Sequence, residues 1–475
     1  MAQVRAARAR AYVRGTRPCS DSATMPTALL LAAGLGLFVP FVIWVRGGDV
    51  LGKRLWILFG LLPFLQPALP QLDFALLSWG ADWPGLVSGI EVTAFDLLVL
   101  AIYFGLNKPR LPSFYSAVLA LYFVAVLLSL LQAAAPTAAF FYFWQICRAG
   151  LLLVVVARVS SDPVILRYIL TGLALGVVLE GFATAYQRFG LGTVQTSGTF
   201  GHQNTLGLVL HFAVLPQVAL LLSGRRDWGT VLVPLAGIAA VVLTTSRAAL
   251  LFAAIGMVLI YILSSLRRVS AHKILIGAAG FLILAAFSPL AVSSFEKRFE
   301  ANPLNEEEYD ERAAFERAAT AILLDKPLGV GANHYVYIAK NFGYSDEAGV
   351  IANEGNRNNL VHNAYLLAAS ETGWPGLVGL FLLLAYPLVR AFRVGWPRRT
   401  GPEGDLLIGL GLGLLMVCLH STLEYILLLR DSLYLLAVVI GMILGLAHTV
   451  ERRARRPEPR PAPLPARREF LVPAE

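Results

Sequence analysis

The sequence predicts an all-α polytopic membrane protein of about 12 transmembrane helices with one large, partly helical periplasmic loop. Hydrophobic residues make up 57% of the 475-residue chain and charged residues only 15%. Ordinary soluble domains carry about 25% charged residues. The apolar residues also gather in stretches of about 20, the length that crosses a bilayer. These observations exclude a disordered chain, a secreted disulfide scaffold and a typical cytosolic enzyme.

Thirteen apolar segments are long enough to be considered as spans. They lie at 27–45, 51–70, 92–106, 113–132, 138–159, 164–187, 204–223, 229–245, 247–264, 274–291, 375–392, 405–421 and 432–449. From residue 46 onward, connections rich in Lys and Arg alternate with connections poor in them. Because cytoplasmic loops carry the excess of Lys and Arg, this alternation predicts twelve spans in an inner membrane, with the C-terminal tail inside.

The first apolar segment, 27–45, does not fit this alternation. As a thirteenth span it would put the N-terminus outside, yet residues 1–24 carry five arginines, which favour the inside. Either this segment is re-entrant or interfacial, or another segment does not span, or the natural start is Met25. A signal peptide would also be apolar after a basic run. We expect an uncleaved helix because no small-residue cleavage site precedes a soluble domain.

The connection 292–361 is the large loop. It holds twelve acidic and seven basic residues, a net charge of −5, so the rest of the chain carries +14. A structureless loop of this length is unusual unless it has a function. Asn305 followed by three glutamates predicts the capped start of a helix over 306–325. The predicted organisation is a basic tail (1–26), transmembrane helices (27–291), the loop (292–361), an interfacial helix with the last three spans (362–449) and a disordered cytoplasmic tail (450–475).

Two charges lie deep inside predicted spans, where ionisable side chains are costly. They are Arg148 in 138–159 and Glu180 in 164–187. One interpretation is a mutual ion pair that fixes two helices, and the other is a polar cavity open toward the outer leaflet.

Arg247 lies in a very short hairpin, TTSRAALL (244–251), that faces the periplasm in this topology. Hydroxyls precede it and a helix follows it. This arrangement suits a phosphate. The alternative is an arginine that extends to lipid headgroups, but outward-facing loops usually avoid arginine.

His362 opens the segment NNLVHNAYLLAASETGWPG, for which we predict a helix over 362–373 and then a turn into the next span. A histidine at an exterior membrane surface is a candidate general base, although most such residues only form hydrogen bonds. Glu371 is nine residues further on and would lie on the opposite helix face, so it is expected to be structural.

Further polar residues occur in exterior segments, in GTFGHQN (198–204) and HSTLEY (420–425). The candidates for supporting roles there are His202, Asn204, His420 and Glu424. No group of them has a metal-ligand spacing, and the chain contains no Asp-x-Asp, so neither a metal nor another cofactor is expected. The three cysteines have no spacing that predicts a zinc site or a redox pair.

These segments resemble the O-antigen ligase / Wzy-type polymerase superfamily. Three motifs carry the resemblance: TTSRAALL (244–251), ERAAFERAATAILLDKPLGVGANHY (311–335) and HNAYLLAASETGWPGL (362–377). GTFGHQNTLG (198–207) resembles the Asn-containing segment of the family. The order and spacing of the motifs match across residues 198–377. Phe315 departs from the pattern, since the family often has Trp there.

The resemblance implies a glycosyltransferase of the C-type membrane fold that moves a glycan from undecaprenyl pyrophosphate to an acceptor hydroxyl. The acceptor is a lipid A-core sugar for a ligase, or another lipid-linked unit of O-antigen or exopolysaccharide for a polymerase. Mapped onto this chain, Arg247 and Arg312 would hold the pyrophosphate and His362 would be the base. Arg317 and Asn363 are possible supporting residues. Membrane lipids are expected as partners, and nucleic acid is not.

A transporter or flippase of lipid-linked sugars is the competing hypothesis. Transporters are often built from internal repeats with a site near the bilayer midplane. The sequence shows no repeat, and its polar motifs gather at the outer surface, which favours an enzyme. Arg148 and Glu180 are the residues that would serve a transporter.

Overall fold

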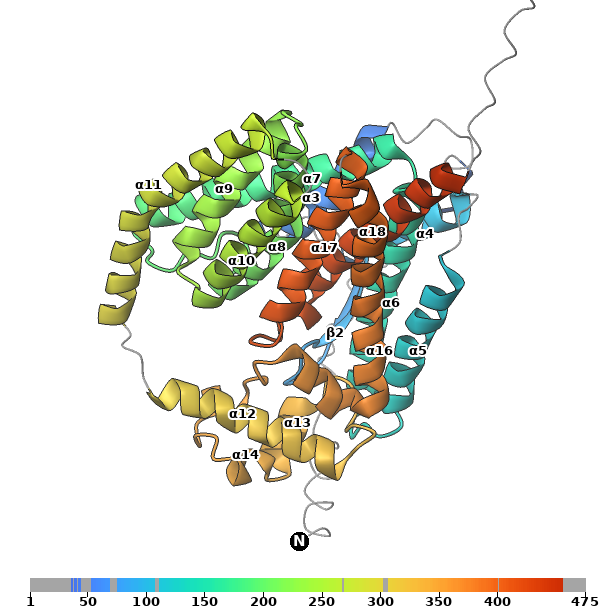
Figure 1. Ribbon diagram of the computed structural model, residues 1–475. Helices are drawn as coiled ribbons and strands as arrows, with labels where there is room; N and C mark the ends of the chain where they lie inside the picture. Colours follow the sequence, from blue (N-terminus) through green and yellow to red (C-terminus); the bar gives the residue numbers. More distant parts are fainter. Residues whose placement is uncertain are drawn as a thin grey trace, which may run out of the picture.

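The computed structural model describes residues 53–68, 75–106, 111–266, 269–301, 306–399 and 401–455, with a few positions between 36 and 43. Predictions for the N-terminal tail, for most of segment 27–45, for the Asn305 cap and for residues 456–475 lie outside the described residues. α-Helices dominate the rest (Figure 1).

Apolar helices form the body of the molecule. Seven are long and apolar enough to cross a membrane, and five more are apolar but shorter. The long ones are α6 (Pro136–Val159), α7 (Pro163–Ala185), α8 (Gln203–Leu222), α10 (Arg247–Ser265), α16 (Ala364–Gly395), α17 (Pro402–His420) and α18 (Arg430–Arg455). The shorter ones are α3 (Ile57–Ala68), α4 (Ala94–Gly105), α5 (Ser113–Ser129), α9 (Trp228–Thr244) and the apolar part, Ala271–Ala286, of α11 (Ala271–Ala301). The polytopic membrane class is confirmed, and the number of crossings stays a prediction.

The helix bundle has a buried centre and an apolar periphery. The most apolar window of α8 is 94% buried inside the protein, whereas that of α10 is 28% buried. α8 packs on α17, and α18 packs on α6. α3 and α7 approach most closely where two glycines meet: a Cβ at Gly60 would lie 2.2 Å from the Ile169 carbonyl oxygen, and one at Gly172 would lie 2.0 Å from that of Ile57. Such small residues allow membrane helices to approach through their backbones.

One part of the described chain departs from the predicted all-α architecture. β1 (Ala75–Gly80) and β2 (Gly89–Thr93) form an antiparallel hairpin, with Trp79 opposite Ile90. The turn of the hairpin holds Asn333: the indole nitrogen of Trp83 donates to the Asn333 carbonyl (2.7 Å), and the Asn333 amide donates to the Val87 carbonyl (2.7 Å). Asn333 has a φ of 65°, and these contacts stabilise that strained backbone.

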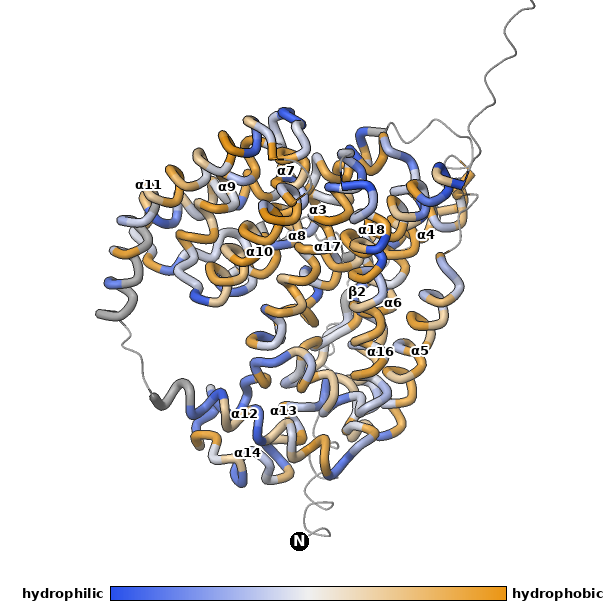
Figure 2. The backbone as a smooth tube through the Cα atoms, in the orientation of Figure 1, coloured by the Kyte–Doolittle hydropathy of each residue, from blue (hydrophilic) through white to orange (hydrophobic). Residues whose placement is uncertain are grey.

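Residues 306–363 form a unit beyond one end of the bundle, which we call the loop unit (Figure 1). Its helices are α12 (Glu306–Asp325), α13 (Tyr335–Asn341), α14 (Tyr344–Glu347) and α15 (Glu354–Arg357). Figure 2 shows hydrophilic residues over this unit and hydrophobic residues along the bundle. α12 occupies the residues predicted to be helical, and its buried side chains include Phe315 and Ile322.

α16 joins the loop unit to the bundle through a break in the helix. Gly373 has a φ of 69°, which only glycine adopts without strain, so the predicted interfacial helix and the following span meet there. The turn after α12 docks on this break: the Trp374 amide donates to the Pro327 carbonyl (3.0 Å), and the Gly331 amide donates to the Glu371 carbonyl (2.9 Å). The backbone of α16 therefore fixes the position of α12.

Two predicted boundaries are corrected. The helix expected from residue 362 begins at Ala364, because the side chain of Asn363 accepts hydrogen bonds from the Tyr365 and Leu366 amides and caps the helix. Residues 450–455, expected in the disordered tail, are helical, since α18 continues through Arg455.

Candidate functional site

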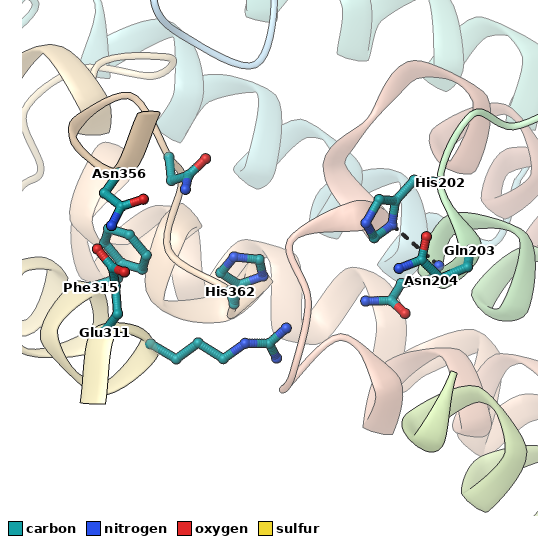
Figure 3. A pocket seen from close by; sticks show the side chains of 9 residues that line it. His202, Gln203, Asn204, Glu311, Phe315, Asn356 and His362 are labelled. Carbon is teal, nitrogen blue, oxygen red and sulfur yellow. Dashed lines mark hydrogen bonds between the residues drawn. The ribbon is translucent and has the colours of Figure 1, made fainter. Parts of the chain in front are cut away.

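A cavity of about 320 Å³ lies between the loop unit and the end of the bundle. Three segments line it: the start of α8, the first turns of α12, and the chain that precedes α16. The lining residues are His202, Gln203, Asn204, Glu311, Arg312, Phe315, Asn356, Asn359 and His362. In Figure 3, His362 lies between His202 and Asn204 on one side and Phe315 on the other.

Glu424, in the turn between α17 and α18, joins the residues of this cavity. Its carboxylate accepts hydrogen bonds from His362 Nδ1 (3.0 Å) and Asn204 Nδ2 (2.6 Å). Arg312 Nη2 lies 3.6 Å from the same carboxylate. The Glu424 side chain is 4% exposed, whereas those of His362 and Arg312 are 25% and 36% exposed. A buried carboxylate thus positions two groups that reach solvent.

Electrostatics keep Glu424 ionised. Burial alone raises the pKa of this carboxyl, but the hydrogen bond and charge of His362 and the charge of Arg312 outweigh burial and hold it below its usual range. Burial lowers the pKa of His202; the charge of Glu424 opposes this shift, and His362 and Arg312 add to it. At neutral pH the cavity therefore combines an ionised carboxylate with a nearby neutral histidine.

Aromatic rings confine His362. Its ring lies 6.2 Å from that of Phe315 and 5.7 Å from that of Tyr425. With Nδ1 bonded to a carboxylate, we assign the proton to Nδ1, which leaves Nε2 as the basic nitrogen. This arrangement of a histidine oriented by a buried carboxylate is suited to taking a proton from a hydroxyl.

Arg247 does not line the cavity, but it begins a helix at the same end of the bundle. Ser246 caps α10, and Arg247 is exposed in its first turn. Ala249 of that turn packs on Gly207, where an added Cβ would lie 2.3 Å from Cβ of Ala249. Gly207 is one turn into α8 from Asn204, so Arg247 is at the level of the cavity rim.

Comparison with known protein families gives evidence that is independent of this geometry. Residues 232–381 match the O-antigen ligase family. The resemblance derived from the motifs is therefore confirmed. No protein in the curated set matches the chain. The match supports the interpretation of the chain as a glycan-transferring membrane enzyme of the O-antigen ligase and polymerase type.

The O-antigen ligase match covers only part of the cavity. Arg247, Arg312 and His362 fall within the matched residues, whereas Asn204 and Glu424 lie outside them. The fold brings these two to His362 from α8 and from the turn before α18. Glu424 was one of several supporting candidates in the sequence, and its central position follows from three-dimensional contacts.

The two charges inside the helices lie elsewhere and do not pair with each other. Arg148 Nε donates to Asp96 Oδ2 (2.9 Å) and its Nη1 lies 3.8 Å from Glu91. Glu180 accepts hydrogen bonds from the backbone amide (2.9 Å) and the hydroxyl (2.6 Å) of Thr199. The interpretation as a mutual ion pair is wrong, because Asp96 in α4 and Glu91 in β2 pair with Arg148, and Thr199 in the 191–202 connection binds Glu180.

Two other candidates hold the loop unit together. Glu371 is 2% exposed, and its carboxylate accepts hydrogen bonds from the amides of Asn333 (2.8 Å) and Tyr335 (3.0 Å). Arg317 donates to the Ala348 carbonyl (2.9 Å). Neither lines the cavity, and their contacts are structural.

Glu371→Ala is expected to lower the free energy of unfolding by about 3 kcal/mol, because two buried backbone amides lose their acceptor. Thermal unfolding of the detergent-solubilised protein measures this. Glu316→Ala, at an exposed position of α12, is the control and should leave the melting temperature unchanged. Equal melting temperatures for both variants would contradict the structural role.

His420 lies behind Glu424 and is fully buried. Its ring is 5.5 Å from those of His211 and Phe252, and within the described ranges neither of its ring nitrogens has a hydrogen-bond partner. No group of three or more His, Cys, Asp or Glu side chains among the described residues could hold a metal ion.

Sequence reasoning missed three residues of the cavity wall, Glu311, Asn356 and Asn359, whereas Gln203 lies in the polar segment GTFGHQN. The sequence indicates Asn356 and Asn359 only weakly. The run NEGNRNN (353–359) is unusually rich in asparagine for a loop. Asparagine is common in turns, so the run alone predicted no site.

Proposed function

We propose that the protein transfers a glycan from undecaprenyl pyrophosphate to an acceptor hydroxyl on the periplasmic side of the bacterial inner membrane. The observation that carries the proposal is the convergence of His362 and Arg312 on one cavity through Glu424, within a chain that matches the O-antigen ligase family. Two groups are needed for this reaction: cations that stabilise the departing pyrophosphate, and a base that activates the acceptor.

His362 is the proposed base. Glu424 accepts a hydrogen bond from Nδ1–H of His362, so Nε2 can take the proton of the acceptor hydroxyl as the hydroxyl oxygen attacks the anomeric carbon of the donor sugar. The bond from that carbon to the pyrophosphate oxygen breaks, and the electron pair leaves with the lipid pyrophosphate. The carboxylate of Glu424 stabilises the imidazolium that forms.

Arg312 and Arg247 are the proposed pyrophosphate ligands. Arg312 is partly exposed and its contact with Glu424 is long at 3.6 Å, so a pyrophosphate could replace part of that contact. A guanidinium can bind two phosphate oxygens at once. Arg247 would approach from the first turn of α10, where the helix N-terminus also favours an anion.

One reconstitution distinguishes the two acceptors. Purified protein receives an undecaprenyl-pyrophosphate glycan, either alone or with a lipid A-core acceptor. A ladder of products from donor alone indicates a polymerase, and a single mass shift of the core indicates a ligase. Product formed in EDTA supports catalysis without a metal. Transport of the lipid across liposomes with no new glycosidic bond would overturn the proposal.

The geometry of the described residues favours an enzyme over the transporter alternative. Arg148 and Glu180 both have close local partners, and the cavity that gathers polar groups lies at one end of the bundle.

Glu424→Gln is expected to lower the free energy of unfolding at neutral pH and to make this loss depend on pH. The pKa of Glu424 is depressed by folding, so its stabilisation is present above the usual carboxyl range and is lost as pH falls through the depressed value. Denaturant unfolding of the wild type and of Glu424→Gln at about pH 7 and about pH 3 tests this. The difference in free energy of unfolding between the two should shrink at acid pH. A difference that grows would contradict an ionised Glu424 in the folded protein.

A further inference from the structure

A second cavity, of about 350 Å³, lies at the opposite end of the bundle. It is formed by the start of α7, the connection after α8, the start of α17 and the last turns of α18. α17 begins at this cavity with Pro402 and ends at His420, close to Glu424. A helix of 19 residues is about 28 Å long, so the two cavities are separated by about the thickness of a bilayer core.

Four arginines surround the second cavity: Arg167, Arg225, Arg398 and Arg453. Glu403 is the one acidic residue in its wall, and it pairs with Arg453 at 2.6 Å. The Arg398 guanidinium donates to the Val394 carbonyl (3.1 Å). The wall therefore carries a net charge of +3, from four positive charges and one negative charge.

The other side of this cavity is apolar. Leu166, Leu170, Leu220 and Leu446 line it between the arginines and the bundle interior. No side chain in the described part of the chain caps the start of α17, whose N-cap is Gly401. The first turn of α17 carries Glu403 and Asp405, so the attraction for an anion comes from the arginines and not from the helix start.

We propose that this cavity binds the phosphodiester headgroup of an anionic phospholipid of the cytoplasmic leaflet, with its acyl chains against the leucines. Arginines at a cytoplasmic membrane end are common and need no ligand. Here, however, four of them converge on one cavity with an apolar wall, while Arg452 and Arg455 on α18 stay outside it. Basic pockets between membrane helices are suited to anionic lipid headgroups. The proposal does not depend on the reaction proposed above.

The test compares two double variants that remove the same charge from the same end of the bundle. Arg167→Gln/Arg225→Gln changes the cavity, and Arg452→Gln/Arg455→Gln is the matched control. Native mass spectrometry of the full-length protein, titrated with phosphatidylglycerol in a neutral detergent, measures lipid binding. We expect the cavity variant to bind about 30-fold more weakly and the control to bind like the wild type. Phosphatidylcholine should not compete.

Other outcomes overturn the proposal. Equal weakening in both variants would mean bulk charge attraction, and unchanged binding in the cavity variant would mean that the lipid binds elsewhere. Inorganic phosphate and glycerol phosphate serve as further probes, and binding of either as tight as that of the lipid would identify a soluble phosphate ligand instead. If the cavity variant does not fold, Arg167→Lys/Arg225→Lys keeps the charge but loses the paired hydrogen bonds. That variant should retain only part of the affinity.

Discussion

Glycan transfer is expected to fall by about 10²–10⁴-fold in His362→Ala, because the acceptor hydroxyl loses its base in the transition state. The variant should still insert and fold, since His362 precedes α16 and a quarter of its side chain is exposed. The measurement is single-turnover transfer from the lipid-linked donor by purified protein. Wild-type rates in this variant would reject His362 as the base.

A histidine far from the cavity provides the control for that experiment. His448 is exposed near the other end of α18, and His448→Ala should transfer glycan at the wild-type rate. Glu424→Gln offers a second comparison, since Glu424 is a positioning residue. Its rate should fall by at least about tenfold, and its pH–rate profile should change shape because the histidine loses its anionic partner.

Arg312→Ala is expected to lower kcat/KM by about 10²–10³-fold, because a cation facing the departing pyrophosphate is lost. The same helix supplies a matched control. Arg317 is one and a half turns away and bonds to the Ala348 carbonyl outside the cavity. Arg317→Ala should therefore lower the melting temperature while keeping the rate of transfer by the folded fraction.

The two arginine variants must be compared both for rate and for thermal unfolding. A large loss of rate in Arg317→Ala with a normal melting temperature would mean that the two arginines have exchanged roles. Arg312→Lys should recover part of the activity, since charge is restored without the paired hydrogen bonds of a guanidinium.

Long apolar stretches made the membrane class predictable, because crossing a bilayer requires both length and low charge. The β1–β2 hairpin was missed because its strands are short and lie in a connection between apolar segments. The partner of His362 was missed for a different reason. Glu371 is close in sequence but bonds to the backbone near Asn333, whereas Glu424 is 62 residues away and reaches His362 through the turn after α17. Pairings of this kind depend on tertiary packing.

The docking of the Pro327–Gly331 turn on the break in α16 has a consequence for tolerance to insertions. The distance between Arg312 and His362 depends on the contact of α12 with α16, both of which follow residue 305 in the chain. The length of the connection from α11 therefore does not determine the distance between Arg312 and His362. Its length can change by several residues at a small entropic cost, as for any loop whose ends are held by other contacts. Homologous chains could differ in length there and still align the same arginine with the same histidine.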